Sequence, residues 1–183
     1  MTLSETILKR RSIRKFLDRP VERDKIEACL EAARLAPSAD NVQPWRFIVV
    51  DDPQVRQRLA QEAFSGIYRI CRFAAAAPVL ILILAHPDIL ANKLGSAVQK
   101  TQFYLLDIGI AGEHLVLAAT ELGLGTCWIG WFNKKRVRKF FSIPGKYDVV
   151  AMMALGYFDP THLAPKRKKA LSDIVRYNTF DWK

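Results

Sequence analysis

The apolar positions near the N-terminus follow the period of an α-helix. They predict an amphipathic helix from about residue 22 to residue 35, with apolar residues at i, i+3, i+4 and i+7, namely Ile26, Cys29, Leu30 and Ala33. Pro37 ends this helix. Upstream, Thr2 and Glu5 have the spacing of a capping box, which predicts a short helix that ends at the basic cluster described below.

Three short apolar runs are typical of buried strands. They cover residues 47–50, 79–84 and 149–155 and contain no charged residue. Asp52 followed by Pro53 predicts the start of another helix directly after the first strand. The longest apolar run, residues 73–85, contains Pro78 and is shorter than the roughly 20 residues that a membrane helix requires. We therefore interpret this run as a buried strand and expect no membrane partner.

The segment from about residue 96 to residue 122 predicts a long helix that is apolar on most sides. Its strongly polar residues recur every seven positions and form one narrow stripe: Lys100, Asp107, His114 and Glu121. A helix that is apolar on nearly every side must be covered on nearly every side, by its own domain or by a second subunit. We favour a homodimer, in which Gly109, Ala111 and Gly112 would let the partner backbone come close. Gly123 follows as the expected helix stop.

Length, composition and charge narrow the range of functions. The 183 residues suit one domain, and no repeat, linker or change of composition divides residues 1–183. Half of the residues are hydrophobic, which is enough for a core. The net charge of +10 indicates anionic partners, whether dinucleotides, nucleic acid or membrane headgroups. Three isolated cysteines favour reduced thiols and a cytoplasmic location, and the scattered His and Cys residues lack the spacing of a metal site.

A dense basic cluster follows the first predicted helix. It contains Lys9, Arg10, Arg11, Arg14 and Lys15, with Ser12 between them. Arg side chains donate pairs of hydrogen bonds that match phosphate oxygens, so the cluster can hold a phosphate, although a basic run alone also fits a solvated surface. A second run, residues 166–169 after Pro165, could fold back and complete the site. We interpret a third run, residues 134–139 after the N-cap Asn133, as the polar face of an amphipathic helix.

Two further segments can contact a flat heteroaromatic ring. In residues 37–45 an amide pair, Asn41 and Gln43, precedes a Pro-Trp step, and such a pair can read the donors and acceptors of a ring edge. In residues 123–132, glycines among apolar and aromatic residues allow a backbone N–H to approach a planar ligand closely. Each segment alone also fits an ordinary turn. A phosphate site combined with a ring site favours a phosphorylated heteroaromatic cofactor, for which FMN is the best candidate.

Four motifs, in their usual order, resemble the FMN-dependent nitroreductase family. They read KRRSIRKF, APSADNVQPWRF, GLGTCWIGWF and ALGYF with PKRKKALSDIV, and they span about residues 8–175. The resemblance implies an α+β fold with a central mixed sheet flanked by helices. It also implies an intertwined homodimer with two FMN sites at the subunit interface. Residues 1–183 would then form a single nitroreductase-like FMN-binding domain.

The resemblance implies a role for each matching residue. The flavin phosphate and ribityl chain would be held by Arg10, Arg11, Ser12 and Arg14, with Lys166 and Lys168 closing on the phosphate. The partner subunit would donate a loop that contains Pro37, Ser38, Ala39, Asn41 and Gln43. The isoalloxazine ring would be backed by Ile129, Gly130 and Trp131, and its edge contacted by Arg69 and Arg72. No side-chain acid or base is demanded, and the flavin would be tuned by Arg14 and by the backbone at Gly130.

The resemblance further implies an enzyme for which NAD(P)H is a visiting electron donor. Hydride would pass to flavin N5 and then, in a ping-pong cycle, to an electron-poor small molecule such as a nitroaromatic or a quinone. The lack of a G-x-G-x-x-G motif fits a dinucleotide without a Rossmann site of its own, and Trp128 and Trp131 would narrow the pocket. One alternative is a flavin-binding or flavin-processing protein without dinucleotide turnover. The other, a nucleic-acid-binding protein, relies on the basic runs and lacks any known nucleic-acid signature, so we expect no nucleic-acid partner.

Overall fold

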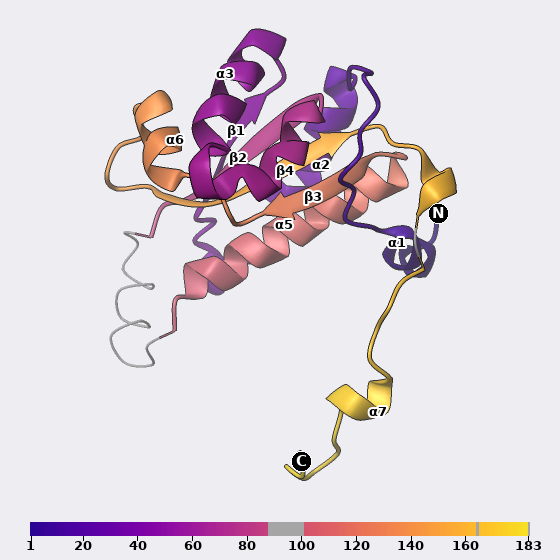
Figure 1. Cartoon of the computed structure of the whole chain (residues 1–183). Coiled ribbons are helices and arrows are strands. Elements are labelled where there is room, and N and C mark those ends of the chain that lie inside the picture. Colours follow the sequence, from indigo (N-terminus) through magenta and orange to yellow (C-terminus); the bar gives the residue numbers. More distant parts are fainter. Residues whose placement is uncertain (88–100, 164, 183) are drawn as a thin grey trace.

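The computed structural model describes residues 1–87, 101–163 and 165–182. Within these residues one sheet has the spatial strand order β1-β2-β4-β3 (Figure 1). The strands are β1 (Trp45–Val50), β2 (Val79–Ala85), β3 (Gly125–Ile129) and β4 (Asp148–Gly156). Their pairings are antiparallel, whereas an isolated bridge between Ser12 and Thr126 is parallel. The four described strands thus form an antiparallel sheet, and the predicted mixed character is limited to this isolated bridge.

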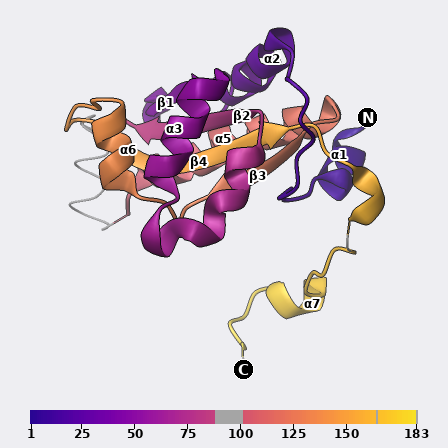
Figure 2. The ribbon, with the colours of Figure 1, turned by 45° about the horizontal axis from the view of Figure 1, so that its top comes forward.

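Helices cover both faces of the sheet (Figure 2). One face carries α2 (Arg23–Arg34) and α5 (Phe103–Glu121), and α1 (Leu3–Lys9) packs against α5. The other face carries α3 (Pro53–Ala63), the 3₁₀ helix η2 (Gly66–Ala76) and α6 (Lys134–Phe140). The remaining short elements are η1 (Ala39–Asn41), η3 (Pro160–His162) and α7 (Leu171–Ile174). The predicted α+β class with flanking helices is confirmed.

The position of β2 explains why its sequence is continuously apolar. Its side chains alternate between two cores: Ile81 and Ile83 pack with α2 and α5, whereas Leu80 and Leu82 pack with α3, η2 and α6. Every residue of the strand is buried. A strand that is covered on both faces needs no polar side, so its sequence does not alternate with the period of a half-exposed strand.

The predicted capping signals are present in the structure. Thr2 Oγ1 accepts a hydrogen bond from the Glu5 N–H, and the Glu5 carboxylate accepts one from the Thr2 N–H, which completes the capping box of α1. The side chain of Asp52 accepts hydrogen bonds from the first turn of α3, and that of Asn133 accepts one from α6. These local contacts satisfy backbone donors that a helix start leaves unpaired.

Other predicted elements need correction. The helix of residues 22–35 is confirmed as α2. The long apolar helix is α5, which begins at Phe103, and residues 96–100 of its predicted range lie outside the described residues. The alternative of an ordinary turn over residues 123–132 is wrong for the central part of this segment, because residues 125–129 pair with β4 as the edge strand β3.

By length and composition alone, α5 could span a membrane, and it is the one helix of which this is true among the described residues. Its contacts are those of a core helix. It packs along α2 and against the sheet, and its buried residues include Ile108, Leu115 and Ala119. The cover that its apolar sequence demands is therefore supplied in part by its own domain.

The glycines of α5 differ in what they face. A Cβ at Gly112 would overlap the indole ring of Trp128, so this notch is filled by the chain itself and the predicted partner contact at Gly112 is wrong. Gly109 faces open space. The apolar side chains of Leu106 and Ile110 are exposed, and this part of α5 is not covered by the described residues.

A polar cluster ties the segment before α2 to the end of β4. The hydroxyl of Tyr157 donates to Glu22 Oε2 and accepts from Lys25 Nζ, both at 2.6 Å. The guanidinium carbon of Arg19 lies 3.9 Å from the centroid of the same ring. The hydrogen bond from Tyr157 is the largest cause that lowers the pKa of Glu22 to about 2. The N-terminal segment is therefore held to the sheet before α2 begins.

Candidate functional site

The basic segment after α1 runs alongside the edge strand β3. The Ile13 N–H donates to the Thr126 carbonyl at 2.8 Å, and Ser12 forms the parallel bridge with the same residue. Ile13 is buried, whereas Ser12 and Arg14 on either side of it are exposed. This alternation is that of an extended chain with one side on the protein and the other in solvent. It presents the predicted cofactor-binding residues along one edge of the sheet.

Gly125 lets the basic segment approach β3 this closely. A Cβ at this position would lie 2.5 Å from Cγ1 of Ile13 and 2.7 Å from Cδ1 of Phe158. Any larger residue must therefore push the basic segment or the C-terminal segment away from the strand. The sequence marks this glycine only as part of a Gly-rich stretch, because its packing role depends on a residue more than a hundred positions away.

Four cations from the two ends of the chain gather beside α1, and we call them the phosphate cluster. The Nζ of Lys166 donates to the Ile7 carbonyl at 2.8 Å, which brings the C-terminal segment to the first helix. The pKa of Lys166 is lowered, first by desolvation and then by like charges. These charges belong to Arg10, Arg11 and Lys168. Among the described residues their one acidic contact is Glu113, 4.0 Å from Arg10 Nε. Such a surplus of positive charge can hold an anion.

Arg14 lies where β3 and η2 meet. Its Cζ is 5.8 Å from the ring centroid of Phe73 in η2. Burial raises the pKa of Cys71 in η2 and of Cys127 in β3, and the positive charge of Arg14 opposes both increases. The side chain thus faces the junction of the two elements and can place its charge beside a ligand there.

The end of β3 combines an open backbone with an aromatic contact. A Cβ added at Gly130, directly after the buried Ile129, would meet no atom within 4 Å. Trp131 packs against Tyr68 of η2 with ring centroids 5.3 Å apart and ring planes tilted by 49°, and its Nε1 donates to the Ile67 carbonyl at 3.1 Å. Trp131 therefore fixes η2 to the end of β3, while the backbone at Gly130 stays open to a ligand.

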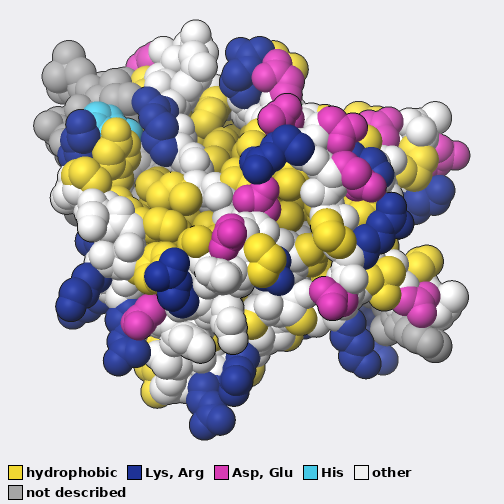
Figure 3. Space-filling view, turned by 90° about the horizontal axis from the view of Figure 1, so that it is seen from above, with side chains coloured by type: hydrophobic (Ala, Val, Ile, Leu, Met, Phe, Trp, Pro, Cys, Tyr) yellow, Lys and Arg dark blue, Asp and Glu magenta, His cyan; other side chains and the backbone are white. Residues whose placement is uncertain are grey.

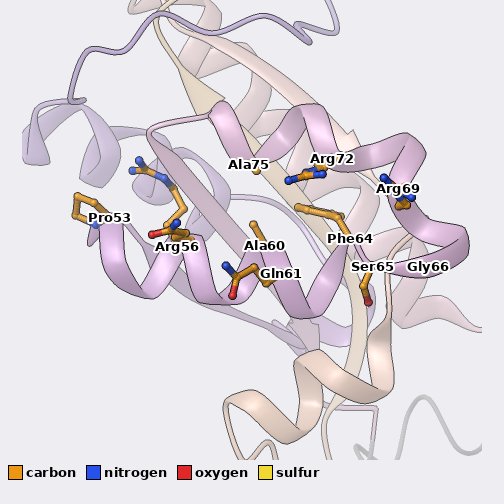
Figure 4. Close-up of a pocket in the computed structure, with 11 residues that line it drawn as sticks. Pro53, Arg56, Ala60, Gln61, Phe64, Ser65, Gly66, Arg69, Arg72 and Ala75 are labelled. Carbon is orange, nitrogen blue, oxygen red and sulfur yellow. The ribbon is translucent and has the colours of Figure 1, made fainter.

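Two predicted ring-edge residues line a cavity. Arg69 and Arg72 extend from η2 into a space of about 670 Å³ between η2 and α3 (Figure 4). From α3 comes Arg56, whose Nη1 donates to the Pro78 carbonyl at 2.7 Å. No sequence pattern points to this third arginine, because the cavity forms only when η2 folds back over α3. Contact of Arg69 and Arg72 with a ring edge stays a prediction.

The predicted amide loop, residues 37–43, lies at the opposite edge of the sheet. It leads into β1, whereas the basic segment runs beside β3, and these are the two edge strands. Within the loop, Gln43 Nε2 donates to Asn41 Oδ1 at 3.1 Å, and the Gln43 N–H donates to Ser38 Oγ at 2.9 Å. Asp40, Asn41 and Gln43 adopt left-handed φ, which a tight polar turn tolerates. The described part of one chain does not bring this loop to the basic segment.

Asp107 of α5 anchors the amide loop from below. Its Oδ1 accepts from the Ala39 N–H at 3.0 Å, whereas its Oδ2 has no partner among the described residues. The side chain is 3% exposed, and this burial raises the pKa of its carboxyl group. The sequence signal was a lone carboxylate in an apolar helix, which marks the residue as unusual but does not identify its partner.

Other kinds of site need metal ligands that lie close together or a continuous basic surface. Residues 1–87, 101–163 and 165–182 contain no group of three His, Cys, Asp or Glu that could hold a metal ion. Figure 3 shows one face of the molecule, on which Lys and Arg side chains lie mainly toward the rim and are separated by acidic and apolar ones. On this face, the cations do not form the continuous basic stripe that nucleic-acid binding favours.

Comparisons with known proteins agree with one family. The model of the Nitroreductase family matches residues 7–70 and 68–157. A protein of Archaeoglobus fulgidus that carries the name NADH dehydrogenase/NAD(P)H nitroreductase is 36% identical over 155 residues, which cover 82% of each chain. The chain therefore belongs to the nitroreductase family, and this family is one of oxidoreductases.

Solved structures show the same fold. A nitroreductase family protein of Clostridium difficile 630 is 32% identical and has a TM-score of 0.82, with 98% of this chain and 100% of that chain covered. An FMN-dependent nitroreductase of Clostridium difficile R20291 is 33% identical and has a TM-score of 0.73, with 96% and 98% covered. Agreement over nearly the full length confirms the family resemblance of the four motifs.

Gly125→Ala should destabilise the protein and loosen the basic segment. The added methyl group must displace Ile13 or Phe158, and overpacking of this kind costs about 1–3 kcal/mol. Urea unfolding measures the loss, and hydrogen exchange at the Ile13 amide should become faster. Gly145→Ala is the control, because a Cβ there would meet no atom within 4 Å. Equal stability and equal exchange in the two variants would show that the close approach is unimportant.

Asp107→Ala should release the Ala39 amide, whereas Asp107→Asn keeps a carbonyl acceptor and should retain most of its protection. A hydrogen bond to a charged group contributes about 1.5–3 kcal/mol, so exchange at Ala39 should accelerate about tenfold or more in the Ala variant.

Because the pKa of Asp107 is raised, its contribution to stability is present below the ordinary value of 3.8 and is lost as the pH rises through the raised value. Asp107→Asn should remove this pH dependence of the free energy of unfolding, which urea titrations at several pH values measure. Unchanged Ala39 exchange in Asp107→Ala would refute the anchor.

Proposed function

We propose that the protein is an FMN-dependent oxidoreductase that moves two electrons from NAD(P)H to an electron-poor small molecule, such as a nitroaromatic or a quinone. Membership of the nitroreductase family supports the reaction class, and one similar structure is named as an FMN-dependent nitroreductase. The observation that carries the proposal is the phosphate cluster, whose four cations have one acidic contact among the described residues and lie at one end of an extended segment. The other end of that segment, at Arg14, reaches the junction of β3 and η2.

The residues present fit both the phosphate-bearing ribityl chain and the ring of FMN. The phosphate would bind to the phosphate cluster, and the exposed hydroxyl of Ser12 is placed for the ribityl chain. The ring would lie between Arg14 and the open backbone of Gly130, with Trp131 at its margin. When bound, FMN supplies the N5 atom that takes the hydride from NAD(P)H and passes it on in a ping-pong cycle. Arg14 would stabilise negative charge that develops on the ring.

We propose further that two copies build the site as an intertwined homodimer. The amide loop and the basic segment lie at opposite edges of the sheet, so a second copy is what can bring Ser38, Asn41 and Gln43 to the same ligand. The C-terminal segment stands away from the body of the domain (Figure 1). It exposes apolar side chains at Leu171, Ile174, Tyr177 and Phe180. Such an arm needs cover in water, and a second copy can supply it.

The donor NAD(P)H would bind as an exchangeable substrate, without a Rossmann-type site of its own. The strand pairings are antiparallel, so the sheet formed by the described residues offers no doubly wound parallel crevice of the kind that holds a dinucleotide in Rossmann folds. The acceptor would take the place of the oxidised donor beside the ring.

Cys29, Cys71 and Cys127 are free thiols, which supports a location in a reducing compartment, the cytoplasm.

Anaerobic mixing of the FMN-loaded protein with NADPH or NADH should bleach the flavin absorbance. Addition of a quinone or a nitroaromatic should then restore the yellow colour. The measurement is the visible spectrum before and after each addition. Bound flavin that neither donor bleaches would reject the oxidoreductase and favour a flavin-binding or flavin-processing protein of the same fold.

Lys166→Gln should weaken the binding of FMN about tenfold or more and leave the binding of riboflavin unchanged. The reason is that a charge-assisted hydrogen bond contributes about 1.5–3 kcal/mol, and only FMN has the phosphate that accepts it. Fluorescence quenching of each flavin measures the two affinities. Lys169→Gln removes the same charge from a neighbouring residue outside the phosphate cluster and serves as the control. An equal loss for FMN and riboflavin would mean that Lys166 does not contact the phosphate.

A further inference from the structure

The cavity between α3 and η2 has the size of a small-molecule site. Its volume of about 670 Å³ lies within the roughly 300–1,000 Å³ that is usual for ligand pockets. Arg56 belongs to the α3 wall and Arg69 and Arg72 to the η2 wall, and Phe64 adds apolar surface between them (Figure 4). The two walls face each other because Gly66 adopts a φ of +59°, a left-handed turn that lets the chain reverse after α3.

The lining of this cavity is cationic. The described residues that line it include three arginines and no Asp or Glu. Arg56 is held in place by its hydrogen bond to the Pro78 carbonyl, which occupies only one of its donors. Arg69 and Arg72 are exposed and make no hydrogen bond or ion pair with the described residues. Unpaired guanidinium groups around a hollow are suited to the oxygens of a phosphoryl group, which they can bind in pairs.

The cavity adjoins the proposed flavin site but is distinct from the phosphate cluster. FMN has one phosphate, and the cluster beside α1 accounts for it. The element between the cavity and the ring position is η2, which carries Phe73 near Arg14 and turns Arg69 and Arg72 toward α3. In a 3₁₀ helix, residues three apart lie directly above one another, so these two arginines share one side. An anion bound in the cavity is therefore one helix away from the ring.

We infer that this cavity binds a phosphoryl group of the nicotinamide dinucleotide donor. The inference rests on the proposed function, because that reaction supplies a second reactant that must approach the ring and that always carries phosphate. NADH and NADPH share a pyrophosphate, and NADPH adds a 2′-phosphate. Binding one of these groups to Arg56, Arg69 and Arg72 would hold the donor while its nicotinamide reaches over η2.

Titration of the FMN-loaded protein with 2′,5′-ADP tests the inference without turnover. Calorimetry should show binding that weakens about tenfold or more in Arg69→Gln, the loss expected for one charge-assisted contact. Gln57→Glu, which adds a negative charge to the α3 wall, should also weaken it. Arg58→Gln and Gln54→Glu make the same charge changes on α3 outside the cavity and should bind as the wild type does. The inference is wrong if the wild type fails to bind 2′,5′-ADP, or if Arg69→Gln and Gln57→Glu bind it as tightly as the controls.

Anaerobic reduction kinetics separate this inference from the proposed function. If neither NADPH nor NADH bleaches the wild type, the proposed function fails, and the titration alone decides whether the cavity binds a nucleotide phosphate. Where bleaching occurs, the dissociation constants of Gln57→Glu for the two donors identify the bound group. A larger constant for NADPH alone supports a 2′-phosphate, and larger constants for both donors support the pyrophosphate. Unchanged dissociation constants for both donors would overturn the inference. A change confined to the dissociation constant for the acceptor would also overturn the inference, because the cavity would then serve the second half of the reaction.

Discussion

The backbone contact between the basic segment and β3 determines where the proposed site can form. Ile13 is buried over Gly125 and bonds to Thr126, so the residues on either side of it have defined positions before any ligand arrives. A terminal chain without this contact would have to be ordered at the moment of binding, and the lost entropy would weaken the complex. Here folding has already ordered it. The cluster around Tyr157 secures the same segment further along, shortly before α2 begins.

The same arrangement has an electrostatic cost. Folding brings Lys166 close to Arg10, Arg11 and Lys168, and the lowered pKa of Lys166 records the repulsion and desolvation that result. Glu113 lies 4.0 Å from Arg10 Nε, and one carboxylate can offset at most one of the four charges. Proteins retain unfavourable charge clusters mainly at functional sites, where a ligand of opposite sign relieves them. The buried and half-paired Asp107 is a second cost of this kind, and it lies under the loop that a second copy would use.

The helix-capping signals that the sequence predicts correctly are local ones. The capping box at Thr2 and the N-caps at Asp52 and Asn133 depend on residues within one helical turn, so they can be read without the fold. Strand β3 is not predicted because Gly125–Ile129 lies in a glycine-rich segment that also fits a turn, and only its pairing with β4 shows that it is a strand. The sequence predicts a strand over the whole apolar run from Phe73, but the first residues of this run belong to η2. A short apolar run has no period that distinguishes a strand from a helix.

The site residues also divide into those that the local sequence indicates and those that depend on the fold. The phosphate cluster could be proposed from composition, and the structure brings its two halves together. The amide loop could be proposed as a turn, yet its anchor on Asp107 and its position at the far edge of the sheet depend on the packing of α5 and on strand order. The cavity arginines were assigned by resemblance to the ring edge, and no sequence signal places Arg56 beside them.

The helix η2 links the two proposed binding regions through its geometry. With three residues per turn, its sides are sharply separated: Arg69 and Arg72 line the cavity, whereas Ala74 is buried in the core. An α-helix of the same sequence would turn Arg72 about 60° away from Arg69 and spread the charges over a wider arc. Trp131 holds η2 against the end of β3, so a shift of this helix would move the cavity and the wall of the flavin site together. Whatever binds on one side of η2 is therefore positioned relative to what binds on the other.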